Sequence, residues 1–155
     1  MEREALRIGL IGYGTIGQEV ARLLTERAEK DMMLVGALVR KPAKARPPGP
    51  PIFFTLSELL SMRPHVVVEA AGHEGLRAHG SHVLRVGIDL IFISAGVLAE
   101  SETSSELLTA AQRGGAQMQL VSGAIGGLDA LAAASLGGLT RVIHTMRKPP
   151  EALLA

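Results

Sequence analysis

The chain has 155 residues, of which 47% are hydrophobic and 3% aromatic, and its formal net charge is +1. This length suits one domain with at most the start of a second, and the apolar content excludes a chain that is disordered throughout. The sequence contains no cysteine, which excludes disulfides, thiolate catalysis and cysteine-ligated zinc, and its scattered basic residues with few aromatics do not suggest a nucleic-acid partner.

Strands and helices are predicted to alternate along the whole chain. Short, nearly continuous apolar runs are typical of parallel strands buried on both faces, whereas apolar residues at helical spacing predict helices. The alternation predicts an α/β fold with a Rossmann-type, doubly wound parallel sheet, followed by a truncated start of a second α/β domain. The expected strands are 6–11, 34–39, 65–69, 88–94, 116–122 and 139–146, and the expected helices are 15–28, 55–62, 74–86, 103–114 and 125–136.

Two segments have the spacing of a helix capping box, and one segment is rich in proline. Thr55-Leu56-Ser57-Glu58 and Thr103-Ser104-Ser105-Glu106 each place a hydroxyl three residues before a glutamate, which predicts a helix start. Residues 41–51 hold five prolines and are expected to form a solvated surface loop with polyproline character.

The first predicted strand runs directly into the glycine-rich turn Gly12-Tyr13-Gly14-Thr15-Ile16-Gly17. A G-x-G-x-x-G pattern between a strand and a helix is typical of dinucleotide binding. Gly12 would permit the tight turn, Gly14 would let the backbone approach a pyrophosphate, and Gly17 would let the helix pack close to the strand. The N–H groups at the helix start would attract the phosphates. The alternative is a strand–helix turn that binds nothing.

The end of the second predicted strand carries information on the type of dinucleotide. Sites that prefer NAD place Asp or Glu there to hold the ribose 2′-OH, whereas this chain has Val39-Arg40-Lys41. Arg40 and Lys41 could accept the 2′-phosphate of NADP, or they could simply face solvent. We therefore expect NADP, or both NADP and NAD, as cofactor.

Three further turns follow predicted strands and are rich in small residues. They are Glu69–Glu74, Ser94–Glu100 and Ser122–Ala130. Ligands of open α/β sheets bind outside the carboxyl ends of the strands. The small residues would leave room there for a flat ring such as nicotinamide.

These segments resemble motifs of the L-aspartate dehydrogenases. The motifs "VEAAGHEG" (68–75), "SAGVLAE" (94–100), "SGAIGGLDAL" (122–131) and "RKPP" (147–150) stand in the order and at the spacing of that family, over nearly the whole chain. The resemblance implies oxidation of L-aspartate to iminoaspartate with NAD or NADP, a reaction that can feed NAD biosynthesis. It also implies that residues 12–17 hold the pyrophosphate, that Ala124 contacts the cofactor, and that residues from Ala71 to His73 lie close to the nicotinamide.

The resemblance stops where the family continues into a second α/β region. In the family, that region closes over the cofactor, supplies an Asn contact and carries the catalytic His. Nothing in this sequence matches it, so we expect a truncated chain with residues 1–122 as the dinucleotide-binding domain and 123–155 as a linker helix and stub of the substrate domain. The catalytic residue is therefore left unassigned.

The histidines and the basic end of the chain offer only general candidates for chemistry. His73 could act as a base near the amino group, or it could be an ordinary histidine at a helix start. His79 and His82 lie three residues apart, but no metal site is expected because a further ligand is missing. Arg147 and Lys148 could bind a substrate carboxylate or could be solvated.

The last predicted strand, 139–146, has few partners within the chain. Unpaired strands promote association, so we expect either self-association through this strand, and hence a homo-oligomer, or fraying of the segment. Three functional hypotheses remain open: an aspartate dehydrogenase completed by oligomerisation or by a separate chain, a catalytically inert NAD(P)-binding module, and a relative of homoserine dehydrogenase or dihydrodipicolinate reductase. The "SGAIGGLDA" and "RKPP" motifs disfavour the third.

The sequence also bears on the location of the protein. No apolar stretch reaches the roughly 18 residues that a membrane span requires. Met1-Glu2-Arg3-Glu4 places acidic residues before the first apolar run, unlike a signal peptide. We therefore expect a cytoplasmic protein with no membrane partner.

Overall fold

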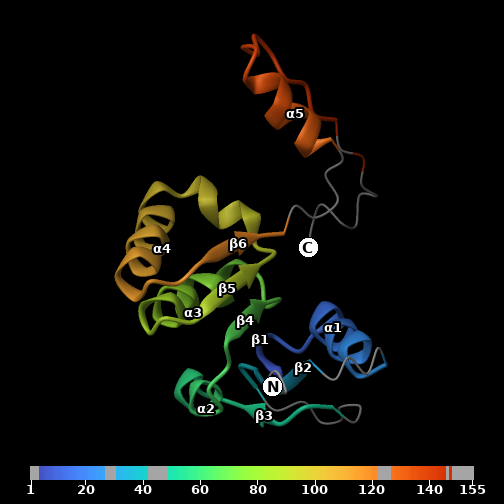
Figure 1. Ribbon diagram of the computed structural model, residues 1–155, viewed down its shortest axis with the longest axis vertical. Helices are drawn as coiled ribbons and strands as arrows, with labels where there is room; N and C mark the ends of the chain where they lie inside the picture. The colour runs from blue at the N-terminus through green and yellow to red at the C-terminus, as the bar shows by residue number, and fades with distance from the viewer. Residues whose placement is uncertain (1–3, 27–30, 42–48, 122–126, 146, 148–155) are drawn as a thin grey trace. The chain divides into compact units, whose positions relative to one another are not determined.

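The computed structural model describes residues 4–26, 31–41, 49–121, 127–145 and 147. The chain divides into two compact units, Met1–Gly123 and Ala124–Ala155. The first unit carries a sheet with its helices, and the described part of the second carries the helix α5 (Leu128–Ser135) (Figure 1). The assignment of the second unit to a substrate domain stays a prediction.

The first unit is a six-stranded parallel sheet, as the alternation of elements predicts. The strand order is β3-β2-β1-β4-β5-β6, so the chain builds the sheet outward from β1 in one direction and then in the other. The carboxyl ends of β1 and β4, which are hydrogen-bonded neighbours, therefore open onto connections that diverge. The strands are β1 (Leu6–Ile11), β2 (Met32–Leu38), β3 (Ile52–Phe53), β4 (Val66–Glu69), β5 (Asp89–Phe92) and β6 (Met118–Leu120).

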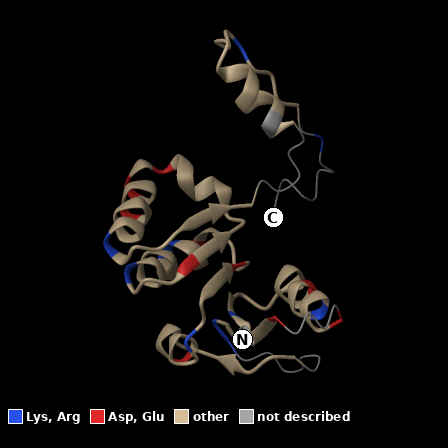
Figure 2. Cartoon of the chain, viewed as in Figure 1, with Lys and Arg blue, Asp and Glu red and all other residues tan. Residues whose placement is uncertain are grey.

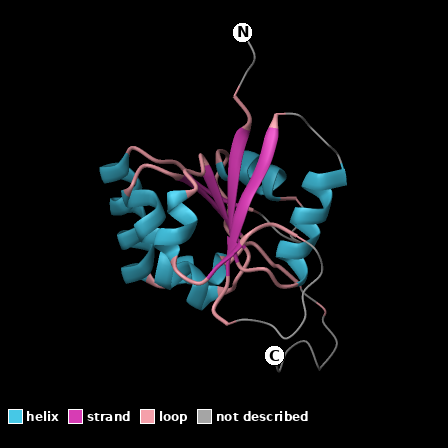
Figure 3. Cartoon of the chain, turned by 90° about the horizontal axis from the view of Figure 1, so that it is seen from below, coloured by secondary structure: helices cyan, strands magenta, loops and turns pink. Residues whose placement is uncertain are grey.

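Helices cover both sides of this sheet (Figure 3). Successive residues of a strand point to opposite faces, and each central strand therefore serves two cores. Leu10 and Ala37 belong to one buried cluster, whereas their neighbours Ile11 and Leu38 belong to the other. The helical elements are α1 (Thr15–Glu26), α2 (Leu56–Ser61), α3 (His73–Arg85), the 3₁₀ helix η1 (Ala95–Ala99) and α4 (Ser101–Gly114).

Basic and acidic residues are interspersed along the elements of the first unit (Figure 2). This distribution agrees with a net charge of +1. Among the residues that the structure describes, no helix is both long and apolar enough to cross a membrane.

One of the two predicted capping boxes forms and the other does not. Thr55 caps α2: its hydroxyl accepts from the backbone N–H of Glu58, whose side chain accepts from the N–H of Thr55. The predicted box at Thr103 is wrong, because α4 begins earlier, at Ser101, and its N-cap Glu100 makes no side-chain capping bond. Thr103 therefore lies within the helix, where its hydroxyl donates to Glu100 Oε2 at 3.1 Å.

Two strand predictions need correction. The short edge strand β3, Ile52–Phe53, is missing from the prediction because two residues are too few to show a pattern. The predicted strand at 139–146 is wrong over its described part, since residues 139–145 form no strand. A strand requires a neighbour to complete its hydrogen bonds, and the described part of the second unit contains only α5.

The two threonines provide a matched test of helix capping. We expect Thr55→Ala to lower the free energy of unfolding by about 1 kcal/mol, because the backbone N–H of Glu58 loses its hydrogen bond to the Thr55 hydroxyl and the capping box is broken. We expect Thr103→Ala to lower it by less than about half of that, because Thr103 caps nothing. Urea denaturation measures both, and equal losses would contradict the assignment of the caps.

Candidate functional site

A cavity of about 530 Å³ lies at the point where the connections of β1 and β4 diverge. Its walls come from the ends of four neighbouring strands and from α3: residues 11–14, residues 38–40, Phe54, residues 70 and 71, and one face of α3. A cavity of this size suits a substantial part of a small organic ligand. The position is the one at which open α/β sheets bind ligands.

The glycine turn forms one wall of the cavity, and its three glycines have different surroundings. Gly12 has φ +96°, and a Cβ there would lie 2.6 Å from the carbonyl oxygen of Ala70. A Cβ on Gly17 would lie 2.3 Å from the carbonyl oxygen of Gly12. The turn itself therefore requires glycine at positions 12 and 17. At Gly14, by contrast, a Cβ would meet no atom of the described residues within 4 Å, so open space borders Gly14 in this part of the chain.

The open space at Gly14 adjoins the start of α1. Gly14 precedes the helix, and its carbonyl oxygen accepts from the N–H of Gln18 at 2.9 Å. The first N–H groups of a helix have no acceptor within that helix and carry a partial positive charge. This combination of open space and helix start suits an anion such as a pyrophosphate.

The turn between β4 and α3 forms another wall and depends on a buried glutamate. Glu69 is fully buried, and its Oε1 accepts from the N–H groups of Ala71 at 2.7 Å and Gly72 at 2.8 Å. Its Oε2 has no hydrogen-bond partner among the described residues. Glu69 is part of the motif at 68–75, but no role was predicted for it. The sequence feature that could have identified it is a charged residue at the end of an otherwise apolar strand.

An ion pair stands at the edge of the cavity. Arg40, just after β2, pairs with Glu74 in the first turn of α3, with Nη1 and Oε2 2.6 Å apart. Both residues line the cavity, although their side chains are 80% and 77% exposed. Arg40 therefore faces the cavity edge as well as solvent. Glu74 was not among the predicted site residues, because 34 positions separate it from Arg40.

The other predicted site residues lie in different places. Tyr13 and Ala71 line the cavity, as do Gly12, Gly14 and Arg40, whereas Thr15, Ile16 and Gly17 form the first turn of α1. His73 does not line the cavity: its ring packs over Gly96 of η1, where a Cβ would lie 2.7 Å from the ring Cε1. Ala124 lies outside the described residues.

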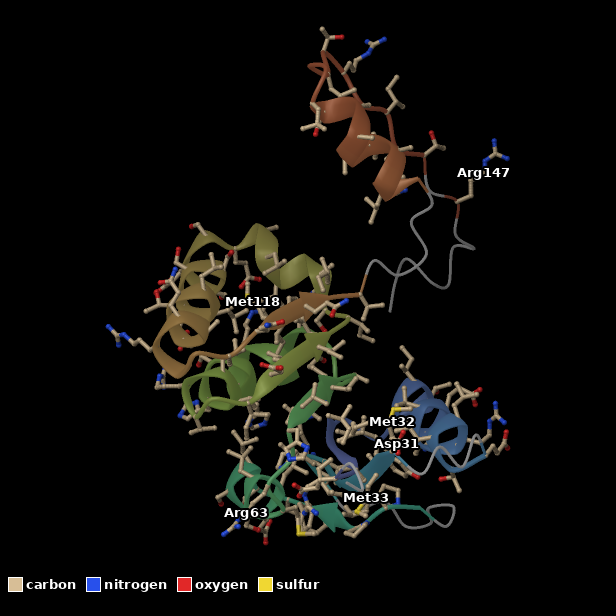
Figure 4. The ribbon with its side chains drawn as sticks, viewed as in Figure 1. Asp31, Met32, Met33, Arg63, Met118 and Arg147 are labelled. Atoms are coloured by element: carbon tan, nitrogen blue, oxygen red, sulfur yellow. The ribbon has the colours of Figure 1, made fainter. Side chains whose placement is uncertain are left out.

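The sequence offered two further candidates, His79 and Arg147, which lie in different units. His79, on the face of α3 that borders the cavity, is a lining residue for which sequence analysis considered only metal binding. Burial, and then the nearby His82, lowers the pKa of His79. Among the described residues, no three His, Asp or Glu side chains gather closely enough to hold a metal ion. Arg147 belongs to the second unit (Figure 4) and is exposed there.

A second ion pair connects α3 to the segment before α4. Arg77 donates from Nε to Glu100 Oε2 at 2.9 Å and from Nη2 to Oε1. This ion pair lowers the pKa of Glu100 to about 2, with Thr103 and His73 making smaller contributions in the same direction.

The chain is similar in sequence to known dehydrogenases. Residues 12–120 match the family of NAD-binding domains of homoserine dehydrogenase. The L-aspartate dehydrogenase of Ralstonia nicotianae is 42% identical over 154 residues, which are 95% of this chain and 57% of that protein. For the L-aspartate dehydrogenase of Ruegeria pomeroyi the identity is 40%, over 97% of this chain and 54% of that protein. The chain thus spans about half the length of these relatives.

Solved structures share the fold. The aspartate dehydrogenase of Thermotoga maritima superposes with a TM-score of 0.65 and 25% identity, over 84% of this chain and 51% of that one. A dihydrodipicolinate reductase from Paenisporosarcina superposes with a TM-score of 0.68 and 20% identity, over 86% of this chain and 53% of that one. The second likeness concerns the fold alone.

Substitutions of two glycines test separately whether the turn needs glycine for stability or for dinucleotide binding. We expect Gly17→Ala to lower the free energy of unfolding by about 1–3 kcal/mol, because the new methyl group would overlap the carbonyl of Gly12. We expect Gly14→Ala to leave stability nearly unchanged but to weaken NADH and NADPH binding by at least about tenfold, because the methyl group fills the open space at the helix start.

Urea denaturation and fluorescence titration with both reduced dinucleotides measure these effects. Gly137→Ala is the matched control, since a Cβ there makes only an ordinary contact of 3.6 Å and Gly137 does not line the cavity. Unimpaired dinucleotide binding by a folded Gly14→Ala variant would contradict the proposed use of this space.

The pair between Arg77 and Glu100 predicts a pH dependence of stability. The pKa of Glu100 lies below its usual value of 4.5 in the folded chain, so the contribution of the pair is present above pH 4.5 and is lost as the pH falls toward about 2. We expect Glu100→Gln to reduce the loss of stability over this interval, and only slightly because the pair is solvent-exposed. Thermal unfolding at several pH values, with Glu102→Gln as control, would contradict the assignment if both variants behaved alike.

Proposed function

The chain belongs to the family of homoserine dehydrogenase-type NAD-binding domains, and from this premise we propose that it binds NAD or NADP in the cavity beside the glycine turn. The observation that carries this proposal is the open space at Gly14, bordered by the start of α1. Gly12 and Gly17 have structural reasons to be glycine, whereas for Gly14 the described residues supply none. A ligand that approaches the backbone supplies the missing reason.

We assign the parts of the cofactor to the walls of the cavity. Residues 12–17 hold the pyrophosphate at the start of α1. Arg40 meets the ribose or its 2′-phosphate, because it lines the cavity just after β2. Ala71 lies on the side of the nicotinamide, with His73 and Ala124 as further contacts that the family resemblance implies. The small side chains at these turns support this assignment, since they leave room for a flat ring.

We further propose that the whole protein is an L-aspartate dehydrogenase. The support is 42% and 40% identity to proteins of that name, over nearly all of this chain. The reaction would convert L-aspartate to iminoaspartate, which water hydrolyses to oxaloacetate and ammonia. The bound nicotinamide supplies the acceptor for the hydride of the carbon that bears the amino group. The chain's own residues bind and orient the cofactor.

The base that takes the proton from the substrate amine is not assigned to this chain. His73 is exposed and packs over Gly96 rather than lining the cavity. The chain covers 57% and 54% of the two relatives. Substrate binding and the catalytic base are therefore proposed for the whole protein and are not assigned to residues of this chain. We also propose that the protein forms a homo-oligomer, which the exposed Leu136 and Ile143 of the second unit support. A cytoplasmic location is proposed from the sequence alone.

The proposed function is tested in two steps with a folded sample. We expect fluorescence titration to detect binding of NADH or NADPH, with loss of affinity in Gly14→Ala but not in Gly137→Ala. Oxaloacetate and ammonia are then added to the reduced cofactor, and its absorbance is followed. Turnover would establish that this chain, alone or as an oligomer, completes the active site.

The two steps separate the alternatives. Binding without turnover would identify a dinucleotide-binding module that requires a further domain or chain for chemistry. If the folded chain binds neither NADH nor NADPH, the proposed function is wrong altogether.

A further inference from the structure

The cofactor specificity of this cavity cannot follow the usual rule for NAD sites. That rule places a carboxylate at the end of the second strand, where it accepts a hydrogen bond from the ribose 2′-OH. The corresponding segment here is Val39-Arg40-Lys41, which contains only apolar and basic side chains. By this segment alone, the site would favour the 2′-phosphate of NADP.

The structure brings a carboxylate to the same place from a distant part of the chain. Glu74 belongs to the first turn of α3, and its Oε2 lies 2.6 Å from Nη1 of Arg40. Both residues line the cavity. The wall after β2 therefore contains an acid–base pair rather than an uncompensated cation.

This pair is exposed and therefore easily rearranged. The side chains of Arg40 and Glu74 are 80% and 77% exposed, so solvent weakens their attraction. An arginine in such a pair can exchange its carboxylate for another anion at small cost. The position of Glu74 at a helix start favours its negative charge, because the N-terminal end of α3 is partially positive.

We propose that Glu74 is a specificity-determining residue that lowers the affinity of this site for NADP relative to NAD. It does so by holding Arg40 in an ion pair and by placing a negative charge beside the position of the 2′ group. NAD presents a neutral hydroxyl, which leaves the pair intact. NADP presents a phosphate, which must take Arg40 from Glu74 and is repelled by the carboxylate that remains. This inference rests on the proposed binding of a dinucleotide in the cavity.

The test compares two variants that each remove one exposed carboxylate. Glu74→Gln keeps the size of the side chain and removes its charge. Glu106→Gln is the matched control, because Glu106 also pairs with an exposed arginine, Arg85, at 3.7 Å but lies on α4 outside the cavity lining. Dissociation constants for NADPH and NADH are measured by fluorescence titration at low ionic strength.

We expect Glu74→Gln to bind NADPH about fivefold more tightly than the unaltered chain, with the affinity for NADH changed by less than about twofold. The gain for NADPH should shrink at high salt, because screening weakens both the ion pair and the repulsion. Glu106→Gln should match the unaltered chain with both dinucleotides. A loss of structure would alter both affinities together and would not produce this selective, salt-dependent gain.

A second variant tests the partner of Glu74. We expect Arg40→Gln to weaken NADPH binding by about tenfold while changing NADH binding by less than about twofold. Equal effects on both dinucleotides would show that Arg40 does not meet the 2′ group, which would overturn the inference.

The outcomes distinguish this inference from the proposed function. If the unaltered chain binds both dinucleotides and Glu74→Gln shows an unchanged or weaker affinity for NADPH, the role of Glu74 is wrong and the proposed function stands. If the unaltered chain binds neither dinucleotide, both fail.

Discussion

The close approach of two turns is the constraint on which the site depends. Gly12, after β1, lies so near the backbone of Ala70, after β4, that a Cβ on Gly12 would come within 2.6 Å of the Ala70 carbonyl oxygen. This approach exists because β1 and β4 are parallel neighbours that end at the same edge of the sheet. Glu69 fixes the second turn through the N–H groups of Ala71 and Gly72. The cavity forms where the two turns diverge beyond this contact.

Charge at this cavity comes from two sources: one is fixed by the backbone, and the other can rearrange. The starts of α1 and α3 both adjoin the cavity, and their partial positive charges are fixed by the backbone. Arg40 and Glu74 are long, exposed side chains whose pairing can change when a ligand binds. The fixed dipoles suit the part of a dinucleotide that NAD and NADP share, whereas we propose that the adjustable pair faces the part in which the two differ. The division follows from backbone rigidity on one side and side-chain freedom on the other.

The local signals in the sequence succeed or fail for identifiable physical reasons. The capping box at Thr55 forms because all of its partners lie within four residues. The similar pattern at Thr103 fails because α4 has already begun at Ser101, directly after its N-cap Glu100. The alternating pattern at 139–145 forms no strand, since alternation alone provides no neighbouring strand. Sequence reasoning therefore misjudged one local pattern, where the helix begins two residues before the predicted cap, and one pattern that requires a distant partner.

The sequence by itself determined the class of fold and the glycine turn. Both depend on local information: the period of apolar residues for strands and helices, and the absence of side chains at positions 12, 14 and 17. Only the tertiary structure decided that Glu74 pairs with Arg40, that Glu69 stabilises the wall of the cavity, and that the ring of His73 packs over Gly96 rather than bordering the cavity. The arrangement of β1, β2, β4 and α3 around one edge of the sheet brings residues 34 positions apart into contact, and no local pattern encodes that distance.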